Sequence, residues 1–228
     1  MRRIGVLAIV VVVTACSSGS SATGPGSTTT STKPTTAAGR IAQAGLLQSS
    51  DLPTGYKASA PGTSDDEAIR STPACGQFPR LTEHGLATAS SPTFFNRETL
   101  VANKVDVFAK SLGPRALIEE LRDPAIIGCL HDLVVASLTA SKSASTLTSL
   151  DVSPIAVDAG GDDSASFRFT AVTTANGTPR TTLQDQVVVR VGRTILVLRP
   201  VASSSGPLAE LETTLIPKLV GRLRHAGA

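Results

Sequence analysis

Every second residue is apolar in several segments of the C-terminal half of this chain. Between Ala165 and Ala171 the apolar positions alternate with polar ones, which is typical of a β-strand with one buried face. Asn176-Gly177 is the dipeptide of a tight hairpin turn. Val, Ile and Leu dominate residues 183–191 and 194–201, on either side of Gly192-Arg193. These patterns predict a strand, a hairpin and two central strands in succession.

The N-terminal half carries further strand signals, and one more lies in the middle of the chain. We expect strands at about residues 56–60, 86–95, 99–109 and 145–155. In the third of these, valines alternate with charged residues, which indicates one buried face. Gly160-Gly161-Asp162 is typical of a turn before the strand that follows it.

Apolar residues spaced three and four apart predict the helices. These are expected at residues 41–49, 115–122, 124–138 and 205–223. Asp123 is suited to cap the start of the third helix, with Pro124 in its first turn. Pro217 lies inside the fourth, where a proline costs about 3 kcal/mol, so we expect a kink or two short helices there.

Together these elements predict an α+β domain in which helices pack on a mostly antiparallel β-sheet of five to seven strands. The domain is expected over residues 41–228, where the composition becomes that of a globular protein. A chain of this length is enough for one domain with a proper core. We find no internal repeat.

The first sixteen residues have the order of a secretory signal. Met1-Arg2-Arg3 precedes an apolar run of about ten residues, and small residues follow. The run Val13-Thr14-Ala15-Cys16 resembles the lipobox of bacterial lipoproteins, in which the thiol receives a diacylglyceryl group and the chain is cut just before it. The resemblance implies a signal peptide at 1–15 and a lipid anchor at Cys16, on the outer face of the cell membrane. The alternatives are a signal peptide in which Cys16 is incidental, or a short uncleaved anchor, although spanning a bilayer takes ~20 residues.

Residues 16–40 begin with this cysteine and continue almost wholly in Ser, Thr, Gly, Ala and Pro. Such a segment buries too little apolar surface to offset the entropy of ordering, so we expect a disordered tether. A flexible chain of this length spans about 25–30 Å, which would lift the domain into the cell wall. The composition also suits O-linked sugars.

The net charge of +3 overstates how basic the mature protein would be. Removing residues 1–15 takes away Arg2 and Arg3, so Lys plus Arg falls from 21 to 19 against 18 acidic residues. A nucleic-acid surface needs a basic stripe, often with aromatic residues. No long Lys/Arg cluster occurs and aromatic residues make up 3% of the chain, so we expect no nucleic-acid partner.

Besides Cys16 the chain has two cysteines, Cys75 and Cys129, and it carries an export signal. Exported proteins meet an oxidising environment, so we favour a disulfide between them. Closing a loop of this size is worth roughly 4 kcal/mol in the chain-entropy model. Two buried free thiols are the alternative. A zinc site is disfavoured because two cysteines without a nearby Cys/His pair do not supply four ligands.

Catalytic motifs are sparse. The histidines are His84, His131 and His225, and the chain contains neither HExxH nor GxSxG. No glycine-rich loop has nucleotide-binding spacing, so we expect no cofactor and no enzymatic activity. A hydrolase built on His131 or His84 would need a serine or carboxylate within hydrogen-bond reach of that histidine.

Two further groups of residues have a plain structural interpretation beside a functional one. Asp158, Asp162 and Asp163 lie in a Gly-rich turn whose spacing matches no calcium loop, so we expect a solvated turn and no metal. Phenylalanines could line an apolar cleft for a lipid or glycolipid, but core packing is the expected use. They are Phe94, Phe95, Phe108, Phe167 and Phe169.

Several short motifs lie along the chain: Leu46-Leu47, Asp51–Tyr56, Cys75-Gly76, Cys129 and Gly161-Asp162 before a strand. Together they resemble an actinobacterial extracellular sensor-type domain, which occurs in receptor Ser/Thr kinases and in free-standing lipoproteins. The resemblance covers residues 41–225 and implies an α+β fold with a sheet, a cleft and usually two disulfides. This chain has one cysteine pair, which leaves part of that cleft less constrained. It has no kinase segment, so sensing would pass through a partner.

The leading functional hypothesis is therefore a cell-envelope lipoprotein with a non-catalytic ligand-binding or sensor-like domain. Its partners would be the membrane, through the lipid anchor, and an apolar small molecule, a glycolipid or an envelope protein. This hypothesis predicts a cleft lined by apolar side chains, with ligand-binding residues unknown. A structural or interaction protein of the envelope is the alternative, and it predicts an exposed apolar patch. A hydrolase is the least favoured hypothesis.

Overall fold

The computed structural model of this chain describes residues 36–59, 71–83, 85–140 and 145–228. In this part of the chain, eight strands form one sheet in the order β1-β3-β4-β8-β7-β6-β5, with β2 pairing with β4 beside β3. The strands are β1 (Lys57–Ser59), β2 (Ala87–Ser90), β3 (Thr93–Phe95), β4 (Thr99–Val107), β5 (Thr146–Pro154), β6 (Asp163–Ala175), β7 (Thr178–Val191) and β8 (Thr194–Ala202). Every pairing among them is antiparallel.

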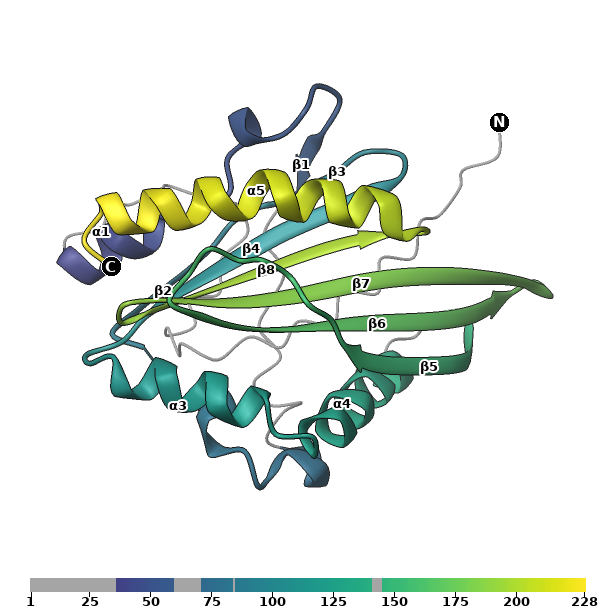
Figure 1. Cartoon of the computed structure of the whole chain (residues 1–228). Helices are drawn as coiled ribbons and strands as arrows, with labels where there is room; N and C mark the ends of the chain where they lie inside the picture. The colour runs from purple at the N-terminus through teal and green to yellow at the C-terminus, as the bar shows by residue number, and fades with distance from the viewer. Residues whose placement is uncertain (1–35, 60–70, 84, 141–144) are drawn as a thin grey trace, which may run out of the picture.

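The sheet lies between two layers of helices (Figure 1). On one face lie α1 and α5, and on the other lie α3 and α4. The helices are α1 (Ala37–Ala44), α3 (Leu112–Leu121), α4 (Ile126–Ala140) and α5 (Ser205–His225), with short 3₁₀ turns at Ser49–Asp51, Pro73–Cys75 and Pro79–Thr82. The predicted α+β class and antiparallel sheet are confirmed, but the sheet has one strand more than the upper limit that the sequence suggested.

Alternation along the strands builds two separate cores. In β4, Val101, Val105 and Val107 are fully buried under α1 and α5. Lys104 and Asp106 point to the other face, toward α3 and α4, where Phe108 joins the second core. All nine residues of β8 are buried because helices cover both of its faces. This explains why residues 195–198 in β8 form an apolar run with no polar residue between them.

Asn176-Gly177 forms the predicted hairpin turn between β6 and β7. Asn176 has φ +50° and Gly177 has φ +74°, the left-handed pair that a two-residue hairpin requires. The hairpin is longer than the alternating pattern indicated, because β6 and β7 stay paired out to Ala175 and Thr178. The projecting end is rich in threonine and carries little apolar surface, so its sequence gives a weaker strand signal.

Two elements differ from the predicted boundaries at the start of the domain. Helix α1 begins at Ala37, so residues 37–40, placed in the tether by composition, form its first turn. Thr36 caps that turn by accepting a hydrogen bond from the Gly39 amide. The strand expected at 86–95 is split into β2 and β3 by Ser91-Pro92, since proline cannot donate to a ladder.

Pro217 does not divide the last helix, contrary to prediction. Helix α5 is one helix from Ser205 to His225. Pro217 and Thr213, whose carbonyl loses its helical partner, both lie on the exposed side of α5. That carbonyl can therefore bond to water, while buried leucines on either side of the proline hold the helix on the sheet.

Candidate functional site

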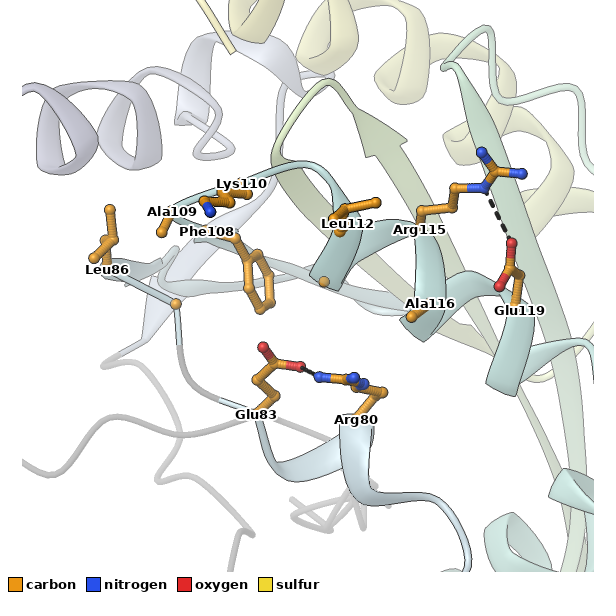
Figure 2. A pocket seen from close by; sticks show the side chains of 12 residues that line it. Arg80, Glu83, Leu86, Phe108, Ala109, Lys110, Leu112, Arg115, Ala116 and Glu119 are labelled. Atoms are coloured by element: carbon orange, nitrogen blue, oxygen red, sulfur yellow. Dashed lines mark hydrogen bonds and ion pairs between the residues drawn. The ribbon is translucent and has the colours of Figure 1, made fainter.

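A surface hollow of about 670 Å³ lies where β4 leads into α3 (Figure 2). Phe108, the residue after β4, lies on it and is 4% exposed. The Phe108 amide donates to the Arg193 carbonyl at 2.9 Å, which ties this connection to the β7–β8 turn. The Leu86 amide donates to the Val107 carbonyl at 2.7 Å and fixes the opposite rim.

Gly85 permits this close approach of the rim to β4. A Cβ atom at position 85 would lie 2.7 Å from the Val107 carbonyl oxygen, closer than packed atoms approach. The absence of a side chain therefore lets Leu86 sit directly beside the end of β4. Its position on the rim depends on that glycine.

Most charged side chains on this hollow are paired with one another. Arg80 Nη1 lies 2.6 Å from Glu83 Oε2, and Arg115 Nε lies 3.0 Å from Glu119 Oε1. The hydrogen bond to Glu83 raises the pKa of Arg80 further above its usual range. Lys110 makes none of the ion pairs found among the described residues. The hollow therefore offers one exposed, unneutralised cation beside two satisfied pairs.

A second hollow of about 620 Å³ adjoins the first and shares Ala109, Lys110 and Leu112 with it. It extends to Gly192-Arg193 and to Gly227-Ala228. The two hollows meet around the connection from β4 to α3. We call this region the α3 entry surface and define it as Leu86, Ala109, Lys110, Ser111, Leu112 and Arg193.

Two leucines stand out on the α3 entry surface. Leu86 is 64% exposed and Leu112 is 71% exposed, and no other large apolar side chain in the described part of the chain is classed as exposed. Both line the same hollow. No sequence pattern indicated this surface, because it joins three segments that are distant along the chain.

Neither hollow is the apolar cleft that a ligand-binding domain predicts. Both mix charged and apolar residues and are open to solvent. Four of the five phenylalanines considered for a cleft are instead core residues, with exposures of 3% or 4%: Phe94, Phe108, Phe167 and Phe169. Core packing, the expected use of these rings, is confirmed.

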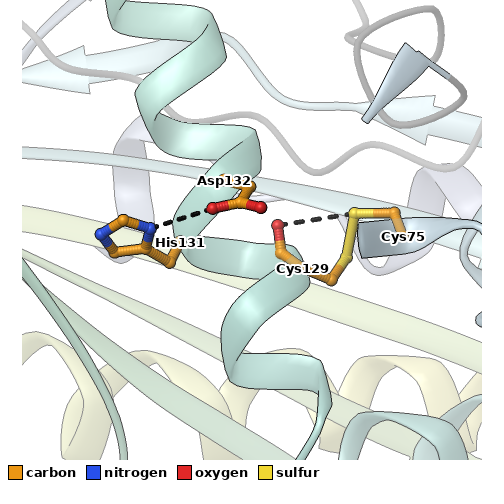
Figure 3. Close-up of a disulfide and its surroundings, with 4 residues drawn as sticks. All are labelled: Cys75, Cys129, His131 and Asp132. Atoms are coloured by element: carbon orange, nitrogen blue, oxygen red, sulfur yellow. Dashed lines mark hydrogen bonds and ion pairs between the residues drawn. A yellow bond between two sulfur atoms is a disulfide. The ribbon is translucent and has the colours of Figure 1, made fainter. Parts of the chain in front are cut away.

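The predicted disulfide between Cys75 and Cys129 is present in the structure (Figure 3). Both residues are buried, and their Cα atoms are 4.7 Å apart. The bond joins the 3₁₀ turn at Pro73–Cys75 to the core side of α4. Cys16 and His84 lie outside the described residues.

His131 and Asp132 are neighbours on the outer face of α4 (Figure 3). His131 Nδ1 lies 3.2 Å from Asp132 Oδ1, and the two side chains are 45% and 55% exposed. The hydrolase hypothesis required a serine or a carboxylate near this histidine, and Asp132 supplies the carboxylate. No described hydroxyl is hydrogen-bonded to His131, however, so no nucleophile accompanies the pair there. His225 lies in the last turn of α5.

The aspartates of the Gly-rich turn are held by protein groups. Asp162 accepts from the Gly192 amide at 2.7 Å and from Arg190 Nη1 at 3.2 Å. Asp163 forms an ion pair with Arg122, and Asp158 accepts from the Gly160 amide. Among the described residues no cluster of His, Cys, Asp or Glu could hold a metal ion.

Two buried ionic groups lie on opposite faces of the sheet. On the α3 side, Lys104 Nζ lies 2.9 Å from Asp106 Oδ2, and burial raises the pKa of Asp106 despite this partner. On the α5 side, Glu212 packs against Arg168 and Asp185. Burial, a hydrogen bond with Asp185 and its charge raise the pKa of Glu212 to about 8. Glu212 is therefore protonated at neutral pH.

No protein-family model matches this chain, and no curated protein matches its sequence. In the described residues no helix is long and apolar enough to cross a membrane.

Two solved structures from Mycobacterium tuberculosis resemble the fold. The extracellular domain of PknH is 13% identical with a TM-score of 0.47, and the match covers 82% of this chain and 97% of that one. LpqN, which is involved in cell envelope biogenesis, is 10% identical with a TM-score of 0.30, over 72% of this chain and 76% of that one. Both are of the kind that the sequence resemblance names, the actinobacterial extracellular domains of kinases and envelope lipoproteins. At these values the likeness carries no argument about function.

Proposed function

We propose that this protein is a lipid-anchored, non-catalytic contact domain of the cell envelope, and that it meets its partner through the α3 entry surface. The exposure of Leu86 and Leu112 on one hollow carries the proposal. Large apolar side chains that gather at an exposed site favour burial against a partner. Their paired, charged surroundings suit an amphipathic partner better than a small apolar ligand.

The anchor part of the proposal rests on the sequence. A positively charged start, a short apolar run and Val13-Thr14-Ala15-Cys16 occur in the order of a lipoprotein signal. Two acyl chains on one cysteine hold a protein stably on a bilayer, whereas one chain does not. We expect Cys16→Ala to release the protein from the membrane fraction or to block its maturation. Retention of a correctly processed variant in that fraction would contradict the anchor.

The non-catalytic part rests on the composition of the site. Glu83 and Glu119 are each engaged by an arginine, and the described lining residues include no histidine or cysteine. General acid–base chemistry needs a titratable group aimed at a substrate. In the described part of the surface Lys110 is a titratable side chain outside the ion pairs, but it is exposed to solvent and not held against an enclosed substrate site.

A photo-crosslinking amino acid placed at position 112 tests the contact role in living cells. Thr181, exposed on the far hairpin, is the matched control position. We expect cross-links to membrane or envelope components at position 112 and few at position 181. Equal labelling at the two positions would show that the α3 entry surface has no special contact role.

A further inference from the structure

The α3 entry surface lies at the same end of the domain as α1, the helix with which the described chain begins. Helix α1, the first described helix, packs over β2 and the second half of β4, against residues such as Ala89 and Val105. Phe108, at the end of that same strand, leads into the α3 entry surface. Figure 1 shows α1, the C-terminus and the connection into α3 at one end of the sheet.

We propose that the α3 entry surface contacts the outer leaflet of the membrane in which the protein is anchored. Leu86 and Leu112 would enter the boundary between headgroups and acyl chains, and Lys110 and Arg193 would meet lipid phosphates. The inference rests on the proposed lipid anchor at Cys16, and it names the partner of the site proposed above.

Chain length allows this contact. About 20 residues separate Cys16 from Thr36, where the described structure begins. A Ser/Thr/Gly-rich chain of that length has a typical end-to-end distance of about 22–27 Å. A tether of this length would therefore keep the end of the domain that carries α1 within reach of the membrane.

Charge also favours a lipid partner. The acidic side chains of the first hollow, Glu83 and Glu119, are each neutralised by an arginine. Lys110 and Arg193 form no ion pair among the described residues, and Arg193 donates only to the Phe108 carbonyl, at 3.3 Å. The uncompensated side-chain charge of the surface is thus positive, which suits an anionic leaflet.

Two leucines and two cations are too few to hold a protein on a membrane from dilute solution, since even a single myristoyl chain binds only marginally. Anchoring changes this situation. A tether makes the second contact intramolecular, with an effective concentration in the millimolar range. A weak surface can then set the orientation of the domain without providing the anchor.

The test uses the lipidated full-length protein in vesicles of phosphatidylglycerol and phosphatidylcholine. A polarity-sensitive fluorophore is attached at Leu112→Cys, and in a matched sample at Thr181→Cys on the far hairpin. Lipids that carry a nitroxide in the upper acyl chain serve as quenchers. We expect at least ~3-fold stronger quenching at position 112, because only that label would reach the lipid.

Charge and apolar contact are then tested separately. With the label at 112, Lys110→Glu and Leu86→Asp should each reduce the quenching at least twofold, whereas Lys57→Glu, exposed on β1, should leave it unchanged. Equal quenching at 112 and 181 would overturn the proposal. A label at 112 that is shielded only when envelope proteins are added would overturn it as well, in favour of a protein partner.

Flotation of the vesicles separates this inference from the anchor. If the lipidated protein floats but its label is not quenched, the anchor stands and the membrane contact is wrong. If the protein does not float, the anchor itself is wrong and the contact falls with it. Thermal unfolding of each variant serves as the folding control. We expect it to be unchanged at positions 86 and 112, because both leucines are exposed.

Discussion

Arg168 and Asp185 stand opposite each other on β6 and β7, and the guanidinium of Arg168 binds both oxygens of the Asp185 carboxylate. Nε lies 2.8 Å from Oδ1 and Nη2 lies 2.5 Å from Oδ2. Glu212 on α5 packs against this pair. One of its oxygens, Oε1, has no hydrogen-bond partner in the described structure. One arginine thus faces two buried carboxyl groups, those of Asp185 and Glu212. Because Asp185 already pairs with Arg168, the Glu212 carboxyl stays protonated.

Glu212 should make the stability of the fold depend on pH. The pKa of Glu212 rises from 4.5 to about 8 on folding, so between these values the folded state binds more protons than the unfolded one. The contribution of Glu212 to the unfolding free energy is fully present below pH 4.5 and is lost as the pH rises to 8. We expect Glu212→Gln to flatten the fall in melting temperature between pH 5 and 8. Between pH 5 and 8 the wild-type protein should lose a few kcal/mol of unfolding free energy that the variant does not lose, at about 1.4 kcal/mol per pKa unit.

Glu210 supplies the control for this experiment, since it lies on the same helix but is exposed. Glu210→Gln should leave the pH profile of the wild type unchanged. Profiles that run parallel for Glu212→Gln and wild type would show that Glu212 is not the group responsible.

Loss of the disulfide should destabilise the domain strongly. The bond between Cys75 and Cys129 spans a sequence separation of 54 residues, for which the chain-entropy model gives about 4 kcal/mol. We expect Cys75→Ala/Cys129→Ala to unfold at a clearly lower urea concentration than wild type. Reducing agent should shift wild type in the same direction and leave the double variant unaffected. A wild-type midpoint that ignores reducing agent would contradict the role of this bond.

Asn103 should be the most sensitive polar residue under α1. Its Oδ1 accepts from the Leu47 amide at 2.7 Å, and its Nδ2 donates to the Gly45 carbonyl at 2.8 Å. Asn103→Ala leaves both backbone groups buried without a partner, at about 1–3 kcal/mol each. Asn103→Asp keeps the acceptor but places a buried carboxylate oxygen against the Gly45 carbonyl, so its unfolding free energy should also fall below that of wild type. Equal values for Asn103→Ala and wild type would contradict the bridge.

Two glycines should respond in opposite directions to the same substitution. A Cβ at Gly161 would lie 2.3 Å from Val189 Cγ1 and 2.7 Å from the Arg190 carbonyl oxygen, whereas a Cβ at Gly221 meets nothing within 4 Å. Gly161→Ala should therefore lower the melting temperature. Gly221→Ala should raise stability by up to about 1 kcal/mol, because alanine suits a helix interior better than glycine. Differential scanning calorimetry on the two variants compares them directly, and shifts of the same sign would refute the expectation.

Local pattern was enough to predict most of the sheet. Alternation at Ala165–Ala171 and the Asn176-Gly177 turn specify strand and hairpin from neighbouring residues alone. The start of α1 was missed because Ala37–Arg40 shares its composition with the tether, and packing of Ala38 onto the core decides its state. The break predicted at Pro217 was wrong because the cost of an interior proline depends on its surroundings. Here the Thr213 carbonyl, which loses its helical hydrogen bond, is exposed to water.

The α3 entry surface could not be predicted from the sequence, for a different reason. Leu86, Leu112 and Arg193 become neighbours only through the fold, and no motif marks an exposed leucine. The ionic groups are a mixed case. The Asn176-Gly177 turn fixes the register of β6 against β7, so the pairing of Arg168 with Asp185 follows from the sequence once the hairpin is predicted, whereas the approach of Glu212 from α5 does not.

The long β6–β7 hairpin gives the domain a fixed height. Strand β7 has 14 residues, so at about 3.3 Å per residue the turn at Asn176 stands roughly 45 Å from the turn at Gly192. Gly192 lies beside Ala228, at the end where α1 begins. A dye at position 176 would therefore report, by energy transfer to dyes in the bilayer, whether the molecule stands upright or lies along the membrane.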